Sequence, residues 1–205
     1  MLRMKSLIAA SCGLALCVAA TANASVTFNQ AQLLGMSISL LDSPGWNPGF
    51  GTGVLSANPT YQDGETPMQG TAGATGGLLS GSTAYYRLNP VDLAAFNLAI
   101  GSGLETLDVV GANDNNQLWD VGIWYKNLAG IIVTDFVTLS PATSGGLSLA
   151  LPVAVLDAGV AVRNSLTQSD DYHASWAVPE PMAIVVWTGL IGIGSLIGVR
   201  RQDRS

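Results

Sequence analysis

Two runs of alternating residues, joined by a short glycine-containing linker, give the clearest structural signal in the chain. Residues 118–126 (LWDVGIWYK) and 131–139 (IIVTDFVTL) are rich in β-branched and aromatic residues, and residues 127–130 connect them. This pattern predicts a β-hairpin. Neither face of the second run is fully polar, so we expect its strand to be buried on both sides or central in a sheet.

Similar short segments recur along the chain with turn residues between them. The segments that predict further strands are 25–33, 36–41, 83–88, 105–110, 147–155, 158–163 and 172–177. Roughly nine short strands at close spacing are typical of an all-β body, a β-sandwich or a jelly roll. One short helix is predicted as well, because Asn89 is a helix cap, Pro90 suits the first helical position and Gly101 ends the apolar run.

Residues 42–82 differ from the rest, because they hold ten glycines and four prolines but few large apolar residues. A segment of this length is too long for an ordinary connection, so it is either a mobile surface loop or a set of loops around short edge strands. Trp46, Phe50 and Tyr61 lie within it. These rings could stack on a sugar, although pinning the segment onto the sandwich is the favoured interpretation.

Charge separates the body, residues 25–177, from the ends of the chain. The body has three basic residues against twelve acidic ones, a net charge of −9. Such a surface repels nucleic acid and anionic membranes, which argues against nucleic acid as a partner. Both cysteines, Cys12 and Cys17, precede the body, so a disulfide framework or a thiolate site is not expected in it.

The first 24 residues have the three parts of a removable signal peptide. Arg3 and Lys5 precede an apolar run over 7–20, and Ala22 and Ala24 place small side chains at alternate positions before Ser25. A signal peptidase accepts this pattern, so cleavage after Ala24 is expected. The sequence therefore predicts an exported protein with an N-terminal signal helix in its precursor.

A second apolar segment lies at the other end of the chain. Residues 182–199 carry no charge, and Arg200, Arg201 and Arg204 follow them. At about 1.5 Å per residue this helix would span roughly 27 Å, close to the thickness of a bilayer core. Arginines beside a spanning helix stay on the cytoplasmic side. The pattern predicts a transmembrane helix in the precursor, with the body outside.

The residues before that segment complete a recognisable tail. Pro179, Glu180 and Pro181 stand directly ahead of the apolar helix and its basic terminus. Prolines keep the backbone extended there, in a form that a protease can grip. The combination, residues 178–205, resembles the PEP-CTERM sorting tail of Gram-negative bacteria. The resemblance implies that an exosortase reads Pro179–Pro181, with Arg200 and Arg201 as the inner-face stop. It also implies an envelope or exopolysaccharide setting associated with biofilms. It implies nothing about the fold of the body.

Candidate chemistry in the body is sparse. Asp114, Asn116 and Asp120 form an oxygen-rich stretch that is the best calcium candidate, although it lacks EF-hand spacing and Asn and Asp also favour turns. Asp170–Asp171 is a weaker candidate. No other cofactor is predicted. His173 is the one histidine, which is too few for a zinc site.

The sequence leaves three functions open for the body. The first is a non-enzymatic structural or adhesive component, transiently anchored in the inner membrane and then delivered to the cell surface, the matrix or the medium. The alternative is a carbohydrate-binding module that contacts exopolysaccharide. Its candidate sugar contacts are Trp46, Trp119, Trp124 and Tyr125. The third is a secreted hydrolase with a site that the sequence does not mark.

Overall fold

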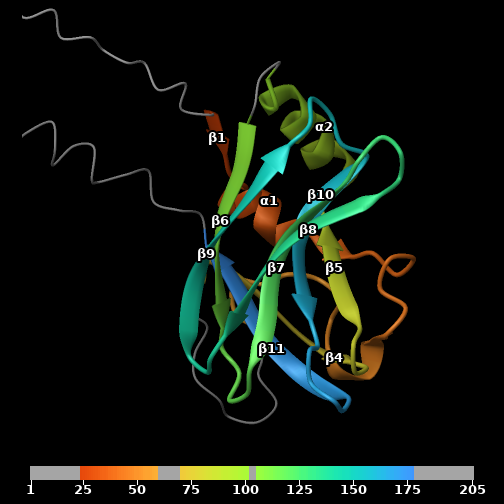
Figure 1. Cartoon of the computed structure of the whole chain (residues 1–205), viewed down its shortest axis with the longest axis vertical. Coiled ribbons are helices and arrows are strands. Elements are labelled where there is room, and N and C mark those ends of the chain that lie inside the picture. The colour runs from red at the N-terminus through yellow and green to blue at the C-terminus, as the bar shows by residue number, and fades with distance from the viewer. Residues whose placement is uncertain (1–23, 60–69, 102–104, 178–205) are drawn as a thin grey trace, which may run out of the picture.

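The computed structural model describes residues 24–59, 70–101 and 105–177, which form two β-sheets packed face to face (Figure 1). The expected signal residues up to Ala22, the Pro179–Pro181 motif, the 182–199 span and Arg200 and Arg201 lie outside this part of the chain. The described residues contain no helix with the length and apolar character needed to cross a membrane.

One sheet, here called sheet A, is built around β6 (Glu105–Asn113). Along one edge β6 pairs antiparallel with β9 (Thr143–Leu151). On its other edge it pairs first with β1 (Ala24–Val26), which is parallel, and then with β11 (Asp170–Ala177). β4 (Ala72–Leu78) and the two-residue β3 (Trp46–Asn47) continue the sheet beyond β11.

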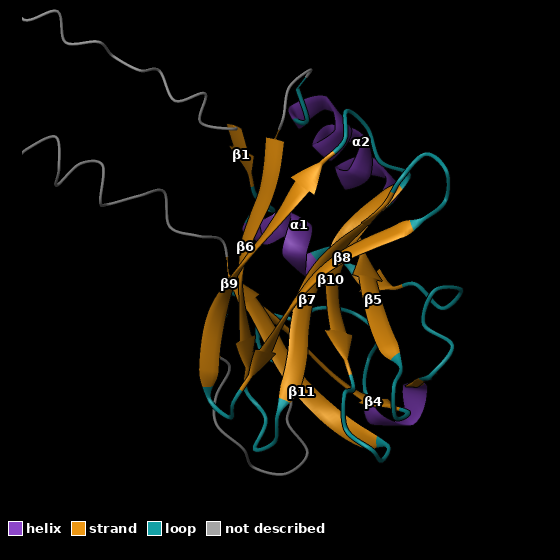
Figure 2. Cartoon of the chain, viewed as in Figure 1, coloured by secondary structure: helices purple, strands orange, loops and turns teal. Residues whose placement is uncertain are grey.

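The second sheet, sheet B, is antiparallel throughout. Its order is β2 (Ser37–Ile38), β5 (Thr83–Arg87), β10 (Asp157–Arg163), β7 (Trp119–Lys126) and β8 (Ile132–Leu139). The pairs β7–β8, β6–β9, β5–β10 and β4–β11 are nested within one another along the chain. This nesting is the strand order of a jelly roll, so the predicted all-β sandwich is confirmed (Figure 2).

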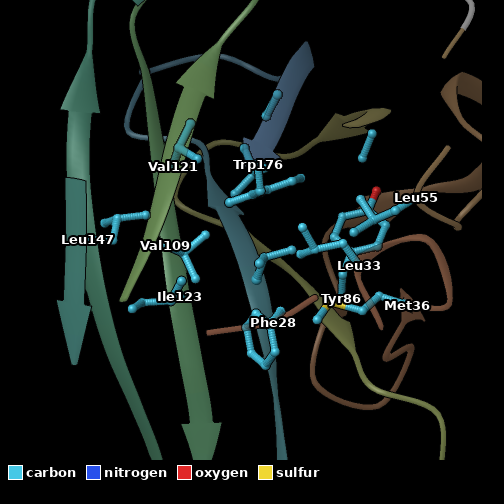
Figure 3. Packing of buried hydrophobic residues seen from close by; sticks show 14 of the residues in the cluster. Phe28, Leu33, Met36, Leu55, Tyr86, Val109, Val121, Ile123, Leu147 and Trp176 are labelled. Atoms are coloured by element: carbon cyan, nitrogen blue, oxygen red, sulfur yellow. The ribbon is translucent and has the colours of Figure 1, made fainter. Parts of the chain in front are cut away.

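The core lies between the two sheets and follows the alternation of each strand. On β7, Trp119, Val121 and Ile123 belong to the core, so the residues between them point to the outer face of sheet B. Figure 3 shows Val121 and Ile123 packed in the same cluster as Val109 and Leu147 of sheet A. The pattern that predicted the 118–126 strand therefore also fixes which of its side chains are available outside.

Two tyrosine hydroxyls join the sheets inside this apolar core. Tyr86 of sheet B and Tyr172 of sheet A are fully buried, and their hydroxyl groups form a hydrogen bond with each other. Burial raises the pKa of both phenols well above the ordinary value. Both side chains therefore stay neutral across the physiological range, and each satisfies the polar group of the other.

The two α-helices differ in how well the sequence predicts them. α2 (Pro90–Ala99) is confirmed, with Asn89 accepting hydrogen bonds from the N–H groups of residues 91 and 92. The strand expected over 25–33 is wrong beyond residue 26, because β1 ends there and α1 (Gln30–Leu34) forms the end of that segment. Asn29 and Gln32 form a reciprocal capping box that supports this short helix.

Two other expectations need correction. β8 is an edge strand of sheet B and is half-exposed, not central or buried on both sides. Residues 42–82 include the seven-residue strand β4, which lies inside sheet A, as well as the short β3 and a 3₁₀ turn, η1 (Pro48–Phe50). The strand expected over 36–41 is limited to Ser37–Ile38.

Candidate functional site

The outer face of sheet B collects side chains that come from four strands far apart in the sequence. Directly opposed residues of an antiparallel pair share a face, so the registers define this set without ambiguity. We call this surface the sheet B face. Its charged and aromatic members are Tyr85 and Arg87 from β5, Asp157 and Arg163 from β10, Asp120, Trp124 and Lys126 from β7, and Phe136 from β8, and Thr138 of β8 also lies on it.

All three basic residues of the body lie on the sheet B face, and each is paired with a carboxylate. Arg163 Nη2 lies 2.7 Å from Asp120 Oδ2, and its Nε donates to the same oxygen at 2.8 Å. Lys126 Nζ lies 2.7 Å from Asp42 Oδ1, and Arg87 Nη1 lies 3.8 Å from Asp157 Oδ2. The face is therefore locally neutral in a body that is otherwise acidic.

Within each pair the carboxylate is the more buried partner. The Asp120 side chain is 2% exposed, whereas that of Arg163 is 45% exposed. Thr138 Oγ1 also donates to Asp120 Oδ1 at 2.6 Å, so both carboxylate oxygens have partners. The carboxylates thus hold the basic side chains from the inner side. The guanidinium groups of Arg87 and Arg163 stay partly exposed, so their outer N–H groups remain accessible to a ligand.

The carboxylates that pair with Lys126 and Arg87 have pKa values shifted in opposite directions. Burial alone would raise the pKa of Asp42, but hydrogen bonds from Lys126 and from the Ser39 hydroxyl outweigh it and hold the pKa below its ordinary value. Burial raises the pKa of Asp157, and its hydrogen bond from the Ala158 N–H and the charge of Arg87 only partly oppose that rise. The difference reflects the closer ion pair at Asp42.

Aromatic side chains lie among the charges. Trp124 is fully buried on this face, and its Nε1 donates to the carbonyl oxygens of Tyr86 and Val160 at 3.0 and 3.1 Å. Tyr85 packs edge-on against it with a centroid separation of 5.0 Å. Tyr85 is half-buried and so presents part of its ring to solvent.

Phe136 lies at the other side of the face and is also half-buried. The Arg163 guanidinium carbon lies 4.5 Å from the centre of its ring, which is a cation–π contact. Residue 122, directly opposite on β7, is glycine, and a Cβ there would meet the Phe136 ring at 2.4 Å. The ring can therefore lie down over the backbone of β7.

A small hollow lies elsewhere, at the β3 edge of sheet A. We call it the Phe50 hollow; it has a volume of about 210 Å³ and is lined by Asn47, Phe50, Gly77, Leu78, Leu79, Ser169, Asp170 and Asp171. It brings together two features that the sequence marks separately, the aromatic Phe50 of the glycine-rich segment and the Asp170–Asp171 pair.

The four candidate sugar contacts predicted from the sequence do not form an exposed platform. Trp119 lies fully buried in the core, and Trp124 is equally buried on the opposite side of β7. Trp46 and Tyr125 are partly buried and pack against the core. Trp119 and Trp124 are therefore closed to a ligand, whereas Trp46 and Tyr125 each expose part of their side chains.

The calcium candidates are also separated. Asp120 is engaged by Arg163 and Thr138 on the sheet B face. Asp114 is buried just after β6 and its N–H donates to the carbonyl of His173, while Asn116 is exposed. Over the described ranges, no group of three or more His, Cys, Asp or Glu side chains is placed to hold a metal ion.

Two further sequence candidates can be placed. His173 is buried on β11, with its Nε2 3.8 Å from Asp171 Oδ2. Ala24, the expected residue before the signal cleavage, opens β1 and pairs with Glu105.

Sequence reasoning missed Tyr85, Arg87, Phe136, Asp157 and Arg163 as members of one surface. One signal was available, because all of these residues except Asp157 lie in segments already expected to be strands, where side chains alternate between the two faces. What the sequence does not supply is the order of the strands, which places β5 and β7 on either side of β10.

No protein-family model matches the chain, and no curated protein is similar to it in sequence. The solved structures that match this chain include two carbohydrate-binding modules. One is a "Family 16 Carbohydrate Binding Module-2", with 18% identity, a TM-score of 0.32, and coverage of 63% of this chain and 86% of that one. The other is the C-terminal family 22 carbohydrate-binding module of Clostridium thermocellum Xyn10B, with 17% identity, a TM-score of 0.33, and coverage of 63% of this chain and 82% of that one.

Proposed function

We propose that the protein is an exported, non-enzymatic carbohydrate-binding module that holds a neutral, hydroxyl-rich polysaccharide across the sheet B face. The observation that carries the proposal is the set of three acid–base pairs arranged beside the partly exposed rings of Tyr85 and Phe136. Of the functions that the sequence leaves open, this arrangement favours the carbohydrate-binding alternative over a purely structural or adhesive role.

Hydrogen bonding supports a sugar as the ligand. Adjacent hydroxyl groups of a sugar ring both donate and accept, and the face offers guanidinium donors next to carboxylate and threonine oxygens. Because the buried Asp120 carboxylate already fixes Arg163, little entropy of that side chain remains to be lost when a ligand binds. Neighbouring strands hold the groups at fixed spacing, which favours a repeating polymer.

Charge supports a neutral ligand over an anionic one. The three bases are each balanced by an acid, so the face has no excess positive charge to offer a uronate or sulfate. The rest of the body is acidic and would repel a polyanion. Binding to a neutral glycan should therefore depend only weakly on salt concentration.

The aromatic rings supply the apolar part of the contact. Tyr85 and Phe136 are half-buried, and their exposed ring areas can pack against the C–H faces of sugar rings. The Arg163 contact holds Phe136 down, and Trp124 supports Tyr85 from below.

Affinity electrophoresis tests this proposal. The exported protein is run through gels that contain the polysaccharide of the producing organism, a neutral β-glucan or an anionic alginate. We expect retardation by at least one neutral glycan, and we expect it to persist at about 0.5 M salt. At that concentration only short-range electrostatic contacts remain unscreened. Unchanged mobility in every neutral glycan, or retardation by alginate alone, would contradict the proposal.

We further propose that the ends of the chain deliver this module. The support is the sequence alone: a signal-peptide pattern ending at Ala24, and Pro179–Pro181 ahead of an apolar segment and arginines. In this account signal peptidase and an exosortase act on the precursor, which is held in the inner membrane only until it is sorted to the surface or matrix.

Intact-mass measurement of the exported protein checks that delivery. We expect loss of residues 1–24 and a new C-terminus near residues 179–181. Replacement of Pro179, Glu180 and Pro181 by alanine should leave the protein in the inner membrane fraction. Finding the complete tail on mature protein would contradict exosortase processing.

A further inference from the structure

We infer that one end of the sandwich, the α2 end, rests on the zwitterionic lipid surface of the membrane that holds the precursor. The α2 end consists of the outer side of α2, the β7–β8 turn (residues 127–131) and the β9–β10 loop (residues 152–156). Figure 1 shows α2 and β1 at this end. The contact presupposes the proposed anchoring of the precursor, but it does not depend on glycan binding at the sheet B face.

The outer side of α2 carries no polar side chain. Its exposed residues Val91, Ala94, Ala95 and Leu98 recur at the spacing of one helix face. On the inner side of the helix Phe96 is buried in the core. A surface helix ordinarily turns polar residues to solvent, whereas a helix that is apolar on both sides is ordinarily covered. The outer side of α2 is therefore a surface that calls for a partner.

The two polar side chains of α2 are engaged within the protein. Asp92 Oδ2 accepts a hydrogen bond from Asn89 Nδ2 at 2.6 Å. The Asn97 side chain exchanges two hydrogen bonds with the backbone of Val155, at 2.9 and 3.0 Å. The bonds to Val155 hold α2 and the β9–β10 loop side by side, so the two segments form one fixed surface.

The two connections beside α2 add apolar side chains and no charge. Residues 127–131 read NLAGI and residues 152–156 read PVAVL. The N–H of Leu156 donates to the carbonyl of Lys126 at 2.8 Å, which holds the loop against the end of β7. Single exposed apolar residues are ordinary, but a group of them at one end marks a contact surface. The large apolar side chains of the α2 end, each at least half exposed, are Val91, Leu98, Leu128, Ile131, Val153 and Leu156.

Charge indicates which lipid surface fits. The three segments of the α2 end hold one charged residue, Asp92, although the body as a whole is strongly acidic. The basic side chains nearest to this end, Arg87 and Lys126, are paired with Asp157 and Asp42. The α2 end can therefore enter a zwitterionic interface without taking an unpaired charge out of water. An anionic surface would repel the acidic body.

Both ends of the body lead to the α2 end. Glu105, the first residue of β6, accepts a hydrogen bond from the N–H of Gly101, which follows α2. Ala24 of β1 pairs with Glu105, so the chain enters the body there. β11 is antiparallel to β6 and therefore runs toward the same end, where Ala177 pairs with Val110.

The length of chain beyond β11 argues for a lipid surface over a second copy of the protein. Val110 lies five residues from the start of β6, which is about 17 Å along the strand. The uncharged segment of the proposed precursor begins at residue 182, five residues after Ala177, and five residues span at most about 18 Å. This tether reaches the α2 end but is too short to keep the body away from the membrane.

Flotation with lipid vesicles tests the contact. The exported protein is mixed with phosphatidylcholine vesicles that contain no sugar, and is centrifuged through a density gradient. We expect half of the protein to float at roughly 1 mM lipid, a weaker association than the roughly 10⁴ M⁻¹ of a single myristoyl chain. Phosphatidylglycerol in the vesicles should lower the floating fraction, because the body is acidic. No flotation at about 5 mM lipid, the order of concentration that a short tether supplies, would overturn the contact.

Three substitutions assign the affinity to the α2 end. Leu98→Asp, Leu128→Asp and Val153→Asp each place a charge in one of its segments, and each should weaken the association about tenfold. Leu118→Asp is the matched control, because Leu118 is also an exposed leucine but precedes β7 at the opposite end of the sandwich. This variant should float as the unaltered protein does.

Two further results would overturn the contact. Flotation that none of the three substitutions weakens would place the lipid affinity elsewhere in the chain. A dimer that these substitutions abolish, without flotation, would assign the α2 end to a second copy. Failure here is distinguishable from failure of the proposed function, because Leu98→Asp leaves the sheet B face intact and should be retarded by the neutral glycan as the unaltered protein is. Intact mass reports on delivery separately.

Discussion

Asp120 has the most buried side chain of the three carboxylates that pair with the body's bases. A charge in that position is stable only while its partners satisfy it. Arg163 and Thr138 occupy its oxygens, and Arg163 also covers Phe136. Arg163 therefore links the stability of sheet B to the position of Phe136 on its outer face.

Replacing Arg163 by glutamine should expose that dependence. The variant leaves the Asp120 carboxylate buried with only the threonine bond, so the free energy of unfolding should fall by roughly 3 kcal/mol. Arg87→Gln is the control, because its ion pair is longer and its side chain more exposed, and it should lose less than about 1 kcal/mol. Denaturant unfolding measures both, and equal losses would contradict the assigned role of Asp120.

The carboxylates of Asp42 and Asp157 should titrate in a fixed order. The pKa of Asp42 lies below its ordinary value and that of Asp157 lies above it, so ¹³C NMR titration of the side-chain carboxyls should place the Asp42 midpoint at lower pH. Coincident midpoints, or the reverse order, would show that the Lys126 pair does not outweigh burial at Asp42.

These two shifts act on stability with opposite signs. The contribution of Asp42 is complete above its unfolded pKa of about 3.9 and is lost as the pH falls through its lower folded pKa. Asp157 binds its proton more tightly when folded, so its contribution is present below the unfolded pKa and is lost as the pH rises through its higher folded pKa.

At the scale of elements, strands with β-branched or aromatic residues could be predicted and a strand of small residues could not. β4 reads AGATGGL, a composition typical of a loop. In the structure small residues are required there, because a Cβ at Gly76 would come within 2.7 Å of both the Trp46 Nε1 and the Tyr172 hydroxyl. Tertiary packing around β4 thus overrides its local propensity.

The candidate site was partly within reach of the sequence for a related reason. The alternation of 118–126 was visible, so the chain itself indicated that Asp120 and Trp124 share a face. Their partners Arg163 and Tyr85 come from other strands, and only the register of β10 brings them together. The burial of Trp124 could not be predicted either, because it depends on carbonyl groups of two neighbouring strands.

Two strand glycines should respond to alanine in contrasting ways. A Cβ at Gly159 in β10 would lie 1.8 Å from the Tyr86 carbonyl oxygen, whereas a Cβ at Gly146 in β9 would meet nothing within 4 Å. Gly159→Ala must displace backbone of the central strands and should destabilise by more than about 3 kcal/mol. Gly146→Ala should be neutral or stabilising by up to about 1 kcal/mol. Thermal unfolding of both variants measures this difference in stability. Similar melting temperatures would contradict the packing of sheet B.

Across the whole molecule, charge is distributed unevenly. The body has a large acidic excess, yet its three bases gather on one face and are neutralised there. The jelly roll makes this possible, because it leaves one broad outer surface of sheet B next to strands that are already fixed by the core. The proposed ligand, a hydroxyl-rich polymer, suits a neutral and partly aromatic surface.

The most direct test of this account compares Tyr85→Ala/Phe136→Ala with the unaltered protein by isothermal titration calorimetry against the neutral glycan that retards it most. The double variant should bind at least about tenfold more weakly, a loss of ~1.4 kcal/mol, because both exposed rings are removed. Val91→Ala, an equally simple truncation at an exposed site on α2, should bind as the unaltered protein does. Undiminished affinity in a folded Tyr85→Ala/Phe136→Ala variant would contradict the assignment of the sheet B face as the binding surface.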